Sequence, residues 1–387
     1  MRKLVQTMTA ALLAAATLGT GIAWADIQIG VAGPMTGSNA AYGAQYKAGV
    51  EAAVAQINAA GGVLGEKLAV VVGDDVSDPK QGVSVANKFV ADGVTFVVGH
   101  YNSGVTIPAS EVYAENGILF VTPTATNPLV TERGLWNAFR ACGRDDQQGI
   151  IAAQFVLEKM KDKKVAIVDD KSTAGQGLAD EMRKAYLAGG GKEVLSEQIN
   201  PGEKDYSALV AKIKQSGAEI LFYGGQHTEA ALIVRQMRDQ GVSTILMGGD
   251  GISNSEFGAI GGDAAAGTLM TSFPDPTTFV TAKGAVEELT KRGVPLEAIT
   301  LYAYAATQVI ADGIVKAGSA DTRKVADYLH SGAESRRCLG RSPMTPRAIS
   351  SSRVSSCSSG SRPTASWPRC RTDGVPRGVW PSAPRSP

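Results

Sequence analysis

Short apolar runs alternate with segments of helical periodicity from residue 27 to about residue 317. Continuous apolar runs of this length are typical of strands that are buried on both faces of a parallel sheet. The segments between them repeat apolar residues every three or four positions, as Val50, Val54 and Ile57 do, and this spacing predicts helices. The first series predicts strands at 27–31, 68–72, 95–98 and 118–121 and helices at 42–60, 79–90 and 105–115.

A second series of the same kind begins after Gly143. It predicts strands at 165–168, 194–198, 220–223 and 244–247 and helices at 145–160, 175–188, 206–215 and 229–240. Each series is large enough to form one sheet with flanking helices. We therefore expect an α/β protein with two parallel sheets.

Three more helices are predicted after the second series, at 280–292, 302–316 and 323–329. We expect them to return to the first lobe, because that lobe otherwise lacks helices to cover its sheet. The expected division is therefore a first lobe of residues 26–144 plus 273–334 and a second lobe of residues 145–272.

The first 25 residues have the pattern of a secretory signal peptide. Arg2 and Lys3 precede an apolar run at 10–23, and Ala23-Trp24-Ala25 fits the small-x-small cleavage pattern. The alternative is a membrane anchor, but the run is short for a membrane span. We expect a soluble protein that is exported to the periplasm and begins near Asp26.

The last 53 residues, 335–387, differ in composition from the rest of the chain. They contain ten Arg, no Lys, no Glu and only one Asp, with no convincing helical or strand period. A disordered tail is one interpretation; a reading-frame shift near Ser335 is our preferred hypothesis. Without this segment, 28 basic side chains face 36 acidic ones, a net charge of −8. An acidic body argues against nucleic-acid binding, which needs clustered Lys and Arg.

The sequence offers no pattern for catalysis or for a metal site. Cys142 is the only Cys in the body of the chain, and no pair of Cys or His has zinc spacing. The residues around Ser103 do not form a Gly-x-Ser-x-Gly nucleophile turn, and Gly189-Gly190-Gly191-Lys192 lacks the spacing of a phosphate-binding loop. We therefore expect no enzyme activity, no cofactor and no metal.

Ten short segments together resemble the periplasmic leucine/isoleucine/valine-binding proteins, the amino-acid branch of the type I periplasmic binding proteins. In this order and spacing they span about residues 26–334. They are Gly33-Pro34-Met35-Thr36-Gly37, Ala41-Tyr42-Gly43, Ile57-Asn58-Ala59-Ala60-Gly61-Gly62-Val63, Asp78-Pro79-Lys80-Gln81, Val98-Gly99-His100, Pro108-Ala109-Ser110, Thr122-Pro123, Asp146-Gln147-Gln148-Gly149, Pro201-Gly202-Glu203-Lys204-Asp205-Tyr206 and Tyr223-Gly224-Gly225. The resemblance implies two Rossmann-like lobes joined by three crossovers, with a ligand cleft between them that closes by a hinge motion.

The resemblance also implies a set of ligand-binding residues. Ser103 and Thr126 match donors to the carboxylate of an amino acid, and Thr124 matches a backbone acceptor for its ammonium group. Tyr42 matches an aromatic residue that packs on the ligand side chain. Asp250 matches the acid that pairs with the ammonium group, one carbon shorter than the usual Glu.

Physical arguments agree with two of these roles and leave simpler alternatives open. Ser103 follows a strand and precedes a helix, where N–H groups and the helix dipole favour an anion, but it could simply cap that helix. The Asp250 carboxylate would make a charge-assisted contact with an ammonium group, but its Gly-rich surroundings equally suit a turn. His100 follows a strand directly, and we expect it to be a hydrogen-bonded structural residue.

Two positions depart from the branched-chain binders. Gln226 and Ala174 stand where those proteins often carry Tyr, so two aromatic walls are missing and Gln226 could offer its amide to a polar ligand side chain. Branched-chain specificity is therefore only the leading expectation. A Cys pair of some relatives is replaced by Ser77 and Asn102, and the third crossover should lie in the unusual C-terminal segment.

Two functions remain open at this stage. The first is the solute-binding component of an ABC importer, which binds a free amino acid and delivers it to an inner-membrane permease. The second is a sensory or regulatory protein that binds amino acids or amides, since the same fold serves in such proteins. We expect a monomer in either case.

Overall fold

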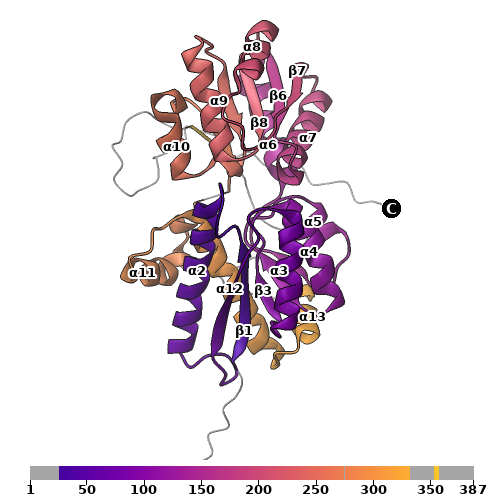
Figure 1. Ribbon diagram of the computed structural model, residues 1–387, viewed down its shortest axis with the longest axis vertical. Coiled ribbons are helices and arrows are strands. Elements are labelled where there is room, and N and C mark those ends of the chain that lie inside the picture. The colour runs from indigo at the N-terminus through magenta and orange to yellow at the C-terminus, as the bar shows by residue number, and fades with distance from the viewer. Residues whose placement is uncertain (1–25, 274, 332–352, 357–387) are drawn as a thin grey trace, which may run out of the picture.

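The computed structural model describes residues 26–273, 275–331 and 353–356 of the 387-residue chain. It contains two α/β lobes, each built on its own sheet, one above the other in Figure 1. The expected signal peptide at 1–25 and most of the segment at 335–387, including the proposed start of the frame shift, lie outside the described residues.

Lobe 1 is the sheet with strand order β2-β1-β3-β4-β5 together with the helices that cover it. All its strand pairs are parallel. The strands are β1 (Ile27–Gly33), β2 (Leu68–Asp74), β3 (Phe96–Val98), β4 (Leu119–Thr122) and β5 (Ala138–Arg140). The helices within this part of the chain are α2 (Ala40–Ala59), α3 (Pro79–Ala91), α4 (Ser103–Glu115) and α5 (Leu129–Glu132).

Helices from the end of the described chain complete the cover of lobe 1. They are α11 (Lys283–Lys291), α12 (Ala298–Ala317) and α13 (Thr322–His330). The core on one side of the sheet contains Ile29 and Val31 of β1 beside Ile310 of α12 and Leu329 of α13. Within the described residues, α12 is the one helix that is long and apolar enough to cross a membrane, but it is mostly buried inside the lobe, as a core helix is.

Lobe 2 is the sheet with strand order β11-β10-β9-β8-β6-β7 and its helices. Five of its strands pair in parallel: β6 (Val165–Asp169), β7 (Glu193–Gln198), β8 (Ile220–Gly224), β9 (Ile245–Gly248) and β10 (Leu269–Ser272). The helices are α6 (Asp145–Lys159), α7 (Thr173–Ala188), α8 (Ser207–Ser216), α9 (His227–Asp239) and α10 (Ser255–Gly261). Short 3-10 turns lie at Asp250–Ile252 and Gly262–Ala265 in lobe 2 and at Pro276–Thr278 and Val280–Ala282 before α11.

The C-terminal segment corrects one expectation. We found no strand pattern in 335–387, yet Arg353–Ser356 forms β11, which pairs antiparallel with β10. Four residues are too few for an alternating pattern to stand out, and pairing with an exposed sheet edge depends on backbone groups rather than side chains. The connection from α13 in lobe 1 to β11 in lobe 2 lies outside the described residues, as does the third crossover that we expected there.

The strands of each sheet end at the boundary between the lobes (Figure 1). In open parallel sheets, ligands bind beyond the carboxyl ends of the strands. The loops that follow β3 and β4 in lobe 1 therefore face those that follow β8 and β9 in lobe 2. We call these four loops and the first residues of the elements after them the interlobe junction.

Candidate functional site

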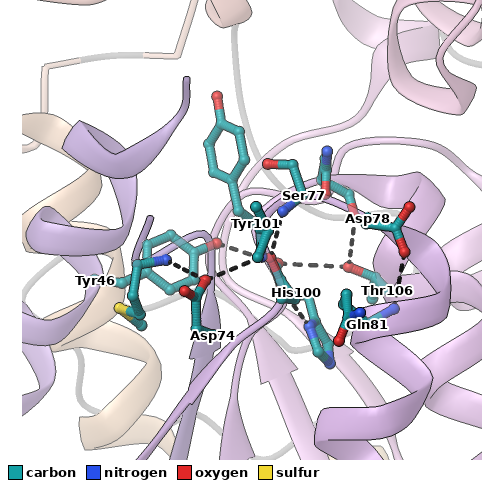
Figure 2. A network of polar contacts seen from close by, with 12 residues as sticks. Tyr46, Asp74, Ser77, Asp78, Gln81, His100, Tyr101 and Thr106 are labelled. Carbon is teal, nitrogen blue, oxygen red and sulfur yellow. Dashed lines mark hydrogen bonds and ion pairs between the residues drawn. The ribbon is translucent and has the colours of Figure 1, made fainter. Parts of the chain in front are cut away.

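A buried histidine fixes the loop between β3 and α4. The side chain of His100 is fully buried; its Nδ1 lies 2.6 Å from Asp75 Oδ2 and its Nε2 lies 2.8 Å from the Tyr113 hydroxyl. Its carbonyl oxygen accepts a hydrogen bond from the Tyr46 hydroxyl at 3.2 Å (Figure 2) and another from the Thr122 hydroxyl at 3.0 Å. The structural role expected for His100 is confirmed, and its contacts hold the residues that follow it in the junction.

Ser103 is the first residue of α4 and is fully buried. Its Oγ accepts a hydrogen bond of 3.1 Å from the backbone N–H of Asn127, in the loop after β4. Asn102 is the cap residue, so the alternative in which Ser103 caps its own helix is wrong. An oxygen that accepts this bond can still donate its own proton, and the first N–H groups of a helix have no acceptor within the helix. This end of α4 therefore favours an anion.

Thr124 and Thr126 lie beside Ser103 in the loop after β4. The Thr124 hydroxyl donates to the carbonyl of Tyr101 at 2.7 Å and is also bonded to the Tyr46 hydroxyl. Thr126 is buried, and its side chain is hydrogen-bonded to the carboxyl of Asp145. The two loops of lobe 1 are thus joined into one polar surface.

Asp250 lies in lobe 2, directly after β9, and its carboxylate is oriented by an amide. Gln148 Nε2 donates to Asp250 Oδ1 at 2.9 Å, and the Asp250 N–H donates to Gln148 Oε1 at 3.0 Å. The same Oε1 accepts from the Thr271 hydroxyl at 3.1 Å. Burial raises the pKa of Asp250 to about 6, while the bond from Gln148 acts to lower it. The group is therefore mostly ionised at pH 7.

A second carboxyl group, which the sequence analysis did not single out, lies close to Asp250. Asp145 begins α6 and is only 1% exposed. Burial raises its pKa to about 8; the Thr126 bond and the charge of Arg140 lower that pKa, and the charge of Asp250 raises it. Within the described part of the chain, Asp145 Oδ2 is buried without a hydrogen-bond partner. In the sequence, Asp145 resembles the acidic residues that commonly begin helices.

Aromatic residues also join the two lobes at the junction. Tyr42, from α2, stacks on Tyr101 with ring centroids 4.4 Å apart and an interplanar angle of 17°. Its hydroxyl lies 3.0 Å from His227 Nδ1 and donates to the Gly251 carbonyl at 3.2 Å, both in lobe 2. The Tyr101 hydroxyl donates to Gln226 Oε1 at 2.8 Å. The structure thus links Tyr42 and Gln226 through Tyr101, and neither Tyr101 nor His227 was among the expected site residues.

The two lobes also touch where helices begin. Asn127 Nδ2 donates to the carbonyl of Thr173, in the first turn of α7, at 3.2 Å. A Cβ atom added to Gly104 would lie 3.1 Å from Thr173 Oγ1. The glycine therefore lets α4 and α7 approach closely, and the lobes are in direct contact across the junction.

The two lobes present groups of opposite charge preference to the junction. The start of α4 and the hydroxyls beside it belong to lobe 1, and the half-buried carboxylate of Asp250 belongs to lobe 2. Among the described residues, no group of three or more His, Cys, Asp or Glu is placed to hold a metal ion. Cys142 is buried, and burial raises its pKa to about 12, which disfavours a reactive thiolate.

Comparisons with known proteins agree on one family. The sequence profile of the family described as periplasmic binding protein matches residues 26–348. The Leu/Ile/Val-binding protein homolog 1 of Brucella abortus is 52% identical over 328 residues, which cover 85% of this chain and 88% of that protein. Among solved structures, the leucine-binding protein LivK of Thermotoga maritima is 28% identical, with a TM-score of 0.79, over 87% of this chain and 96% of that one. The branched-chain amino acid transporter substrate-binding protein LivJ of Streptococcus pneumoniae, solved with isoleucine, is 27% identical, with a TM-score of 0.78, over 87% and 96%.

Proposed function

The chain belongs to the periplasmic binding protein family, and from this premise we propose that it is the solute-binding component of an ABC importer that captures a free amino acid between its lobes. The proposal rests on one observation: at the junction, one lobe presents groups that favour an anion and the other presents a group that favours a cation. The start of α4, with Ser103, favours an anion, and Asp250 favours a cation. A free amino acid carries both charges on one carbon atom, so it is suited to bridge the lobes.

Each site residue takes a definite role in this proposal. Ser103 and Thr126 donate to the ligand carboxylate, the Thr124 carbonyl accepts from the ammonium group, and Asp250 pairs with its charge. Tyr42 and Gln226 lie toward the ligand side chain. The branched-chain amino acids are the first candidates, because the relatives are named for Leu, Ile and Val and the LivJ structure contains isoleucine.

We also propose where the protein works and how it is divided. Residues 1–25 are a cleavable signal peptide, and the exported monomer acts in the periplasm and hands its ligand to an inner-membrane permease. Lobe 1 comprises residues 26–144 plus 273–334, and lobe 2 comprises residues 145–272 together with β11 (Arg353–Ser356). Binding needs no cofactor and no chemical step: the free energy of ligand contacts from both lobes stabilises the closed form.

A thermal-shift screen of the purified chain tests this function. We expect at least one free amino acid to raise the unfolding temperature, because a ligand at 100 times its Kd stabilises a protein by about 2.7 kcal/mol. Calorimetry then gives the Kd and the stoichiometry of one ligand per chain. Amides and urea serve as related polar solutes that lack the α-amino acid group. If no amino acid shifts the transition and an amide or another solute does, the proposed ligand class is wrong.

A further inference from the structure

The ring of Tyr101 occupies the space between the two residues assigned to the ligand side chain. It points from lobe 1 toward lobe 2, away from the buried His100 (Figure 2). Its face lies against Tyr42 at 4.4 Å between centroids, and its hydroxyl bonds Gln226 at 2.8 Å. Tyr101 is 6% exposed, although it lies in a loop at the junction.

No ligand group fits between these partners while they are in contact. Ring faces at this separation and angle touch, so a methyl group cannot enter between Tyr42 and Tyr101 without parting them. Parting Tyr101 from Gln226 breaks a hydrogen bond that joins the lobes and leaves a buried hydroxyl without its acceptor. A large ligand side chain would therefore have to displace contacts that themselves stabilise closure.

The backbone of Tyr101 is fixed close to the groups proposed to bind the ligand carboxylate. Its carbonyl accepts from the Thr124 hydroxyl at 2.7 Å, and Ser103 follows two residues later. The neighbouring His100 is held by Asp75 and Tyr113. The loop therefore holds the Tyr101 ring in a fixed position relative to the groups proposed to bind the ligand carboxylate, and the ring limits the depth of the site.

We propose that Tyr101 is a specificity-determining residue that restricts the site to amino acids with small side chains, such as glycine, alanine and serine, and disfavours leucine, isoleucine and valine. This inference rests on the proposed function, since it concerns the same site. It replaces the branched-chain amino acids, which the names of the relatives suggest as first candidates, with smaller ones, because the restriction comes from the volume of the Tyr101 ring between Tyr42 and Gln226. Space for a branched side chain is created when the ring is removed.

Calorimetry with the purified chain tests the inference with six ligands: glycine, L-alanine, L-serine, L-valine, L-leucine and L-isoleucine. We expect the unmodified protein to bind L-alanine at least tenfold more tightly than L-leucine. Tyr101→Ala and the milder Tyr101→Leu should each raise the affinity for L-leucine at least tenfold relative to L-alanine. Tyr101→Phe is the matched control: it keeps the ring, removes the bond to Gln226 and should keep the preference for L-alanine.

The outcomes separate this inference from the proposed function. If the unmodified protein binds L-leucine as tightly as L-alanine or more tightly, Tyr101 does not limit the ligand and the proposed function stands. A gain in L-leucine affinity in Tyr101→Phe equal to that in Tyr101→Ala also overturns the inference, because ring volume would not matter. If none of the six amino acids binds and another amino acid shifts the unfolding transition, the inference is wrong and the proposed function stands; if no amino acid binds, both proposals are wrong. The ranking in the unmodified protein decides the question even if Tyr101→Ala fails to fold.

Discussion

Asp250 is held in one orientation by a single amide side chain. Gln148 bonds both the carboxylate and the backbone N–H of Asp250, and Thr271 fixes the Gln148 oxygen in turn. A fixed carboxylate loses little side-chain entropy when a cation binds to it, so more of the contact energy remains for affinity. At the scale of the residue, this preorganisation is the main reason to expect a strong contact with an ammonium group.

We predict that Asp250→Ala weakens amino-acid binding by about 2 kcal/mol or more, about 30-fold, because the bound ammonium group loses its charged partner. Calorimetry at pH 7 measures the change. The exposed Asp263, also in lobe 2, provides a control, since Asp263→Ala removes an equal charge away from the junction. Equal affinity in Asp250→Ala and the unmodified protein would remove Asp250 from the site.

Asp145 makes stability depend on pH. Its folded pKa, about 8, lies above its ordinary value of 3.8, so the folded state binds the proton more tightly and stability falls as pH rises between these values. Burial raises the pKa values of Asp250 and Asp170 to about 6, so these two groups contribute to the same decline in stability only at lower pH. The decline above pH 6 therefore comes mainly from Asp145, and His227, whose pKa burial lowers from 6.5, opposes it in the lower part of the interval from pH 6 to pH 8.

We predict that Asp145→Asn flattens the loss of stability between pH 6 and pH 8. That loss should reach up to a few kcal/mol in the unmodified protein, since one pKa unit corresponds to about 1.4 kcal/mol. Urea unfolding at the two pH values measures both proteins. Parallel losses of stability in the two would show that Asp145 does not hold its proton in this range.

The sequence could predict the residues that follow strands, but not how they pair. Ser103, Thr126 and Asp250 each come directly after or soon after a predicted strand, and the structure brings them to one junction. Tyr101 follows the same predicted strand as Ser103 but was not singled out, and neither was Asp145, because their importance depends on burial and on partners such as Gln226 that are distant in the sequence.

At the scale of elements, helices with a clear period and strands with a continuous apolar run were predicted, and strands without such a run were missed. The helix predicted at 79–90 is α3, where Asp78 accepts bonds from two N–H groups and Pro79 is the first helical residue. The strands β5 and β10 were not predicted. Arg140 ends β5 and two polar residues end β10, so neither has the continuous apolar run of β3, and both form by pairing with β4 and β9.

The packing of α2 on α12 depends on a glycine. A Cβ atom at Gly49 would lie 2.2 Å from the carbonyl oxygen of Thr300 and 3.1 Å from the Cβ of Ala303. We predict that Gly49→Ala destabilises the protein by about 1–3 kcal/mol, because the two helices must move apart. Urea unfolding measures the change as a lower midpoint.

Gly284 provides the matched control for Gly49. It lies in α11 of the same lobe, and a Cβ atom there would meet no other atom within 4 Å. Gly284→Ala should therefore stabilise the protein by up to about 1 kcal/mol, the usual gain for this change in a helix. Similar effects of both substitutions would mean that helix propensity, rather than the contact with Thr300, determines the result.

At the scale of the whole molecule, two helix starts meet across the boundary between the lobes. Gly104 in α4 faces Thr173 in α7, and Asn127 donates to the Thr173 carbonyl across the boundary. Because these contacts join separate lobes, a side chain added between them opposes closure without entering either core. Stability and ligand affinity should therefore respond differently to a substitution at Gly104.

We predict that Gly104→Val weakens amino-acid binding about tenfold or more and leaves the unfolding midpoint of the unliganded protein nearly unchanged. The added methyl groups would clash with Thr173, whose Oγ1 lies 3.1 Å from the position that a Cβ atom of residue 104 would take. This clash raises the free energy of the closed form, and the apparent affinity falls in proportion to the population of that form. Calorimetry measures the affinity, and small-angle scattering measures whether the ligand still compacts the protein. Thr173→Ala removes that nearest atom, so adding it to Gly104→Val should restore part of the affinity. If Gly104→Val binds the amino acid and compacts like the unmodified protein, α4 and α7 do not meet in the bound state. If Gly104→Val loses affinity and the added Thr173→Ala restores none of it, the loss arises from the start of α4 rather than from the approach of the lobes.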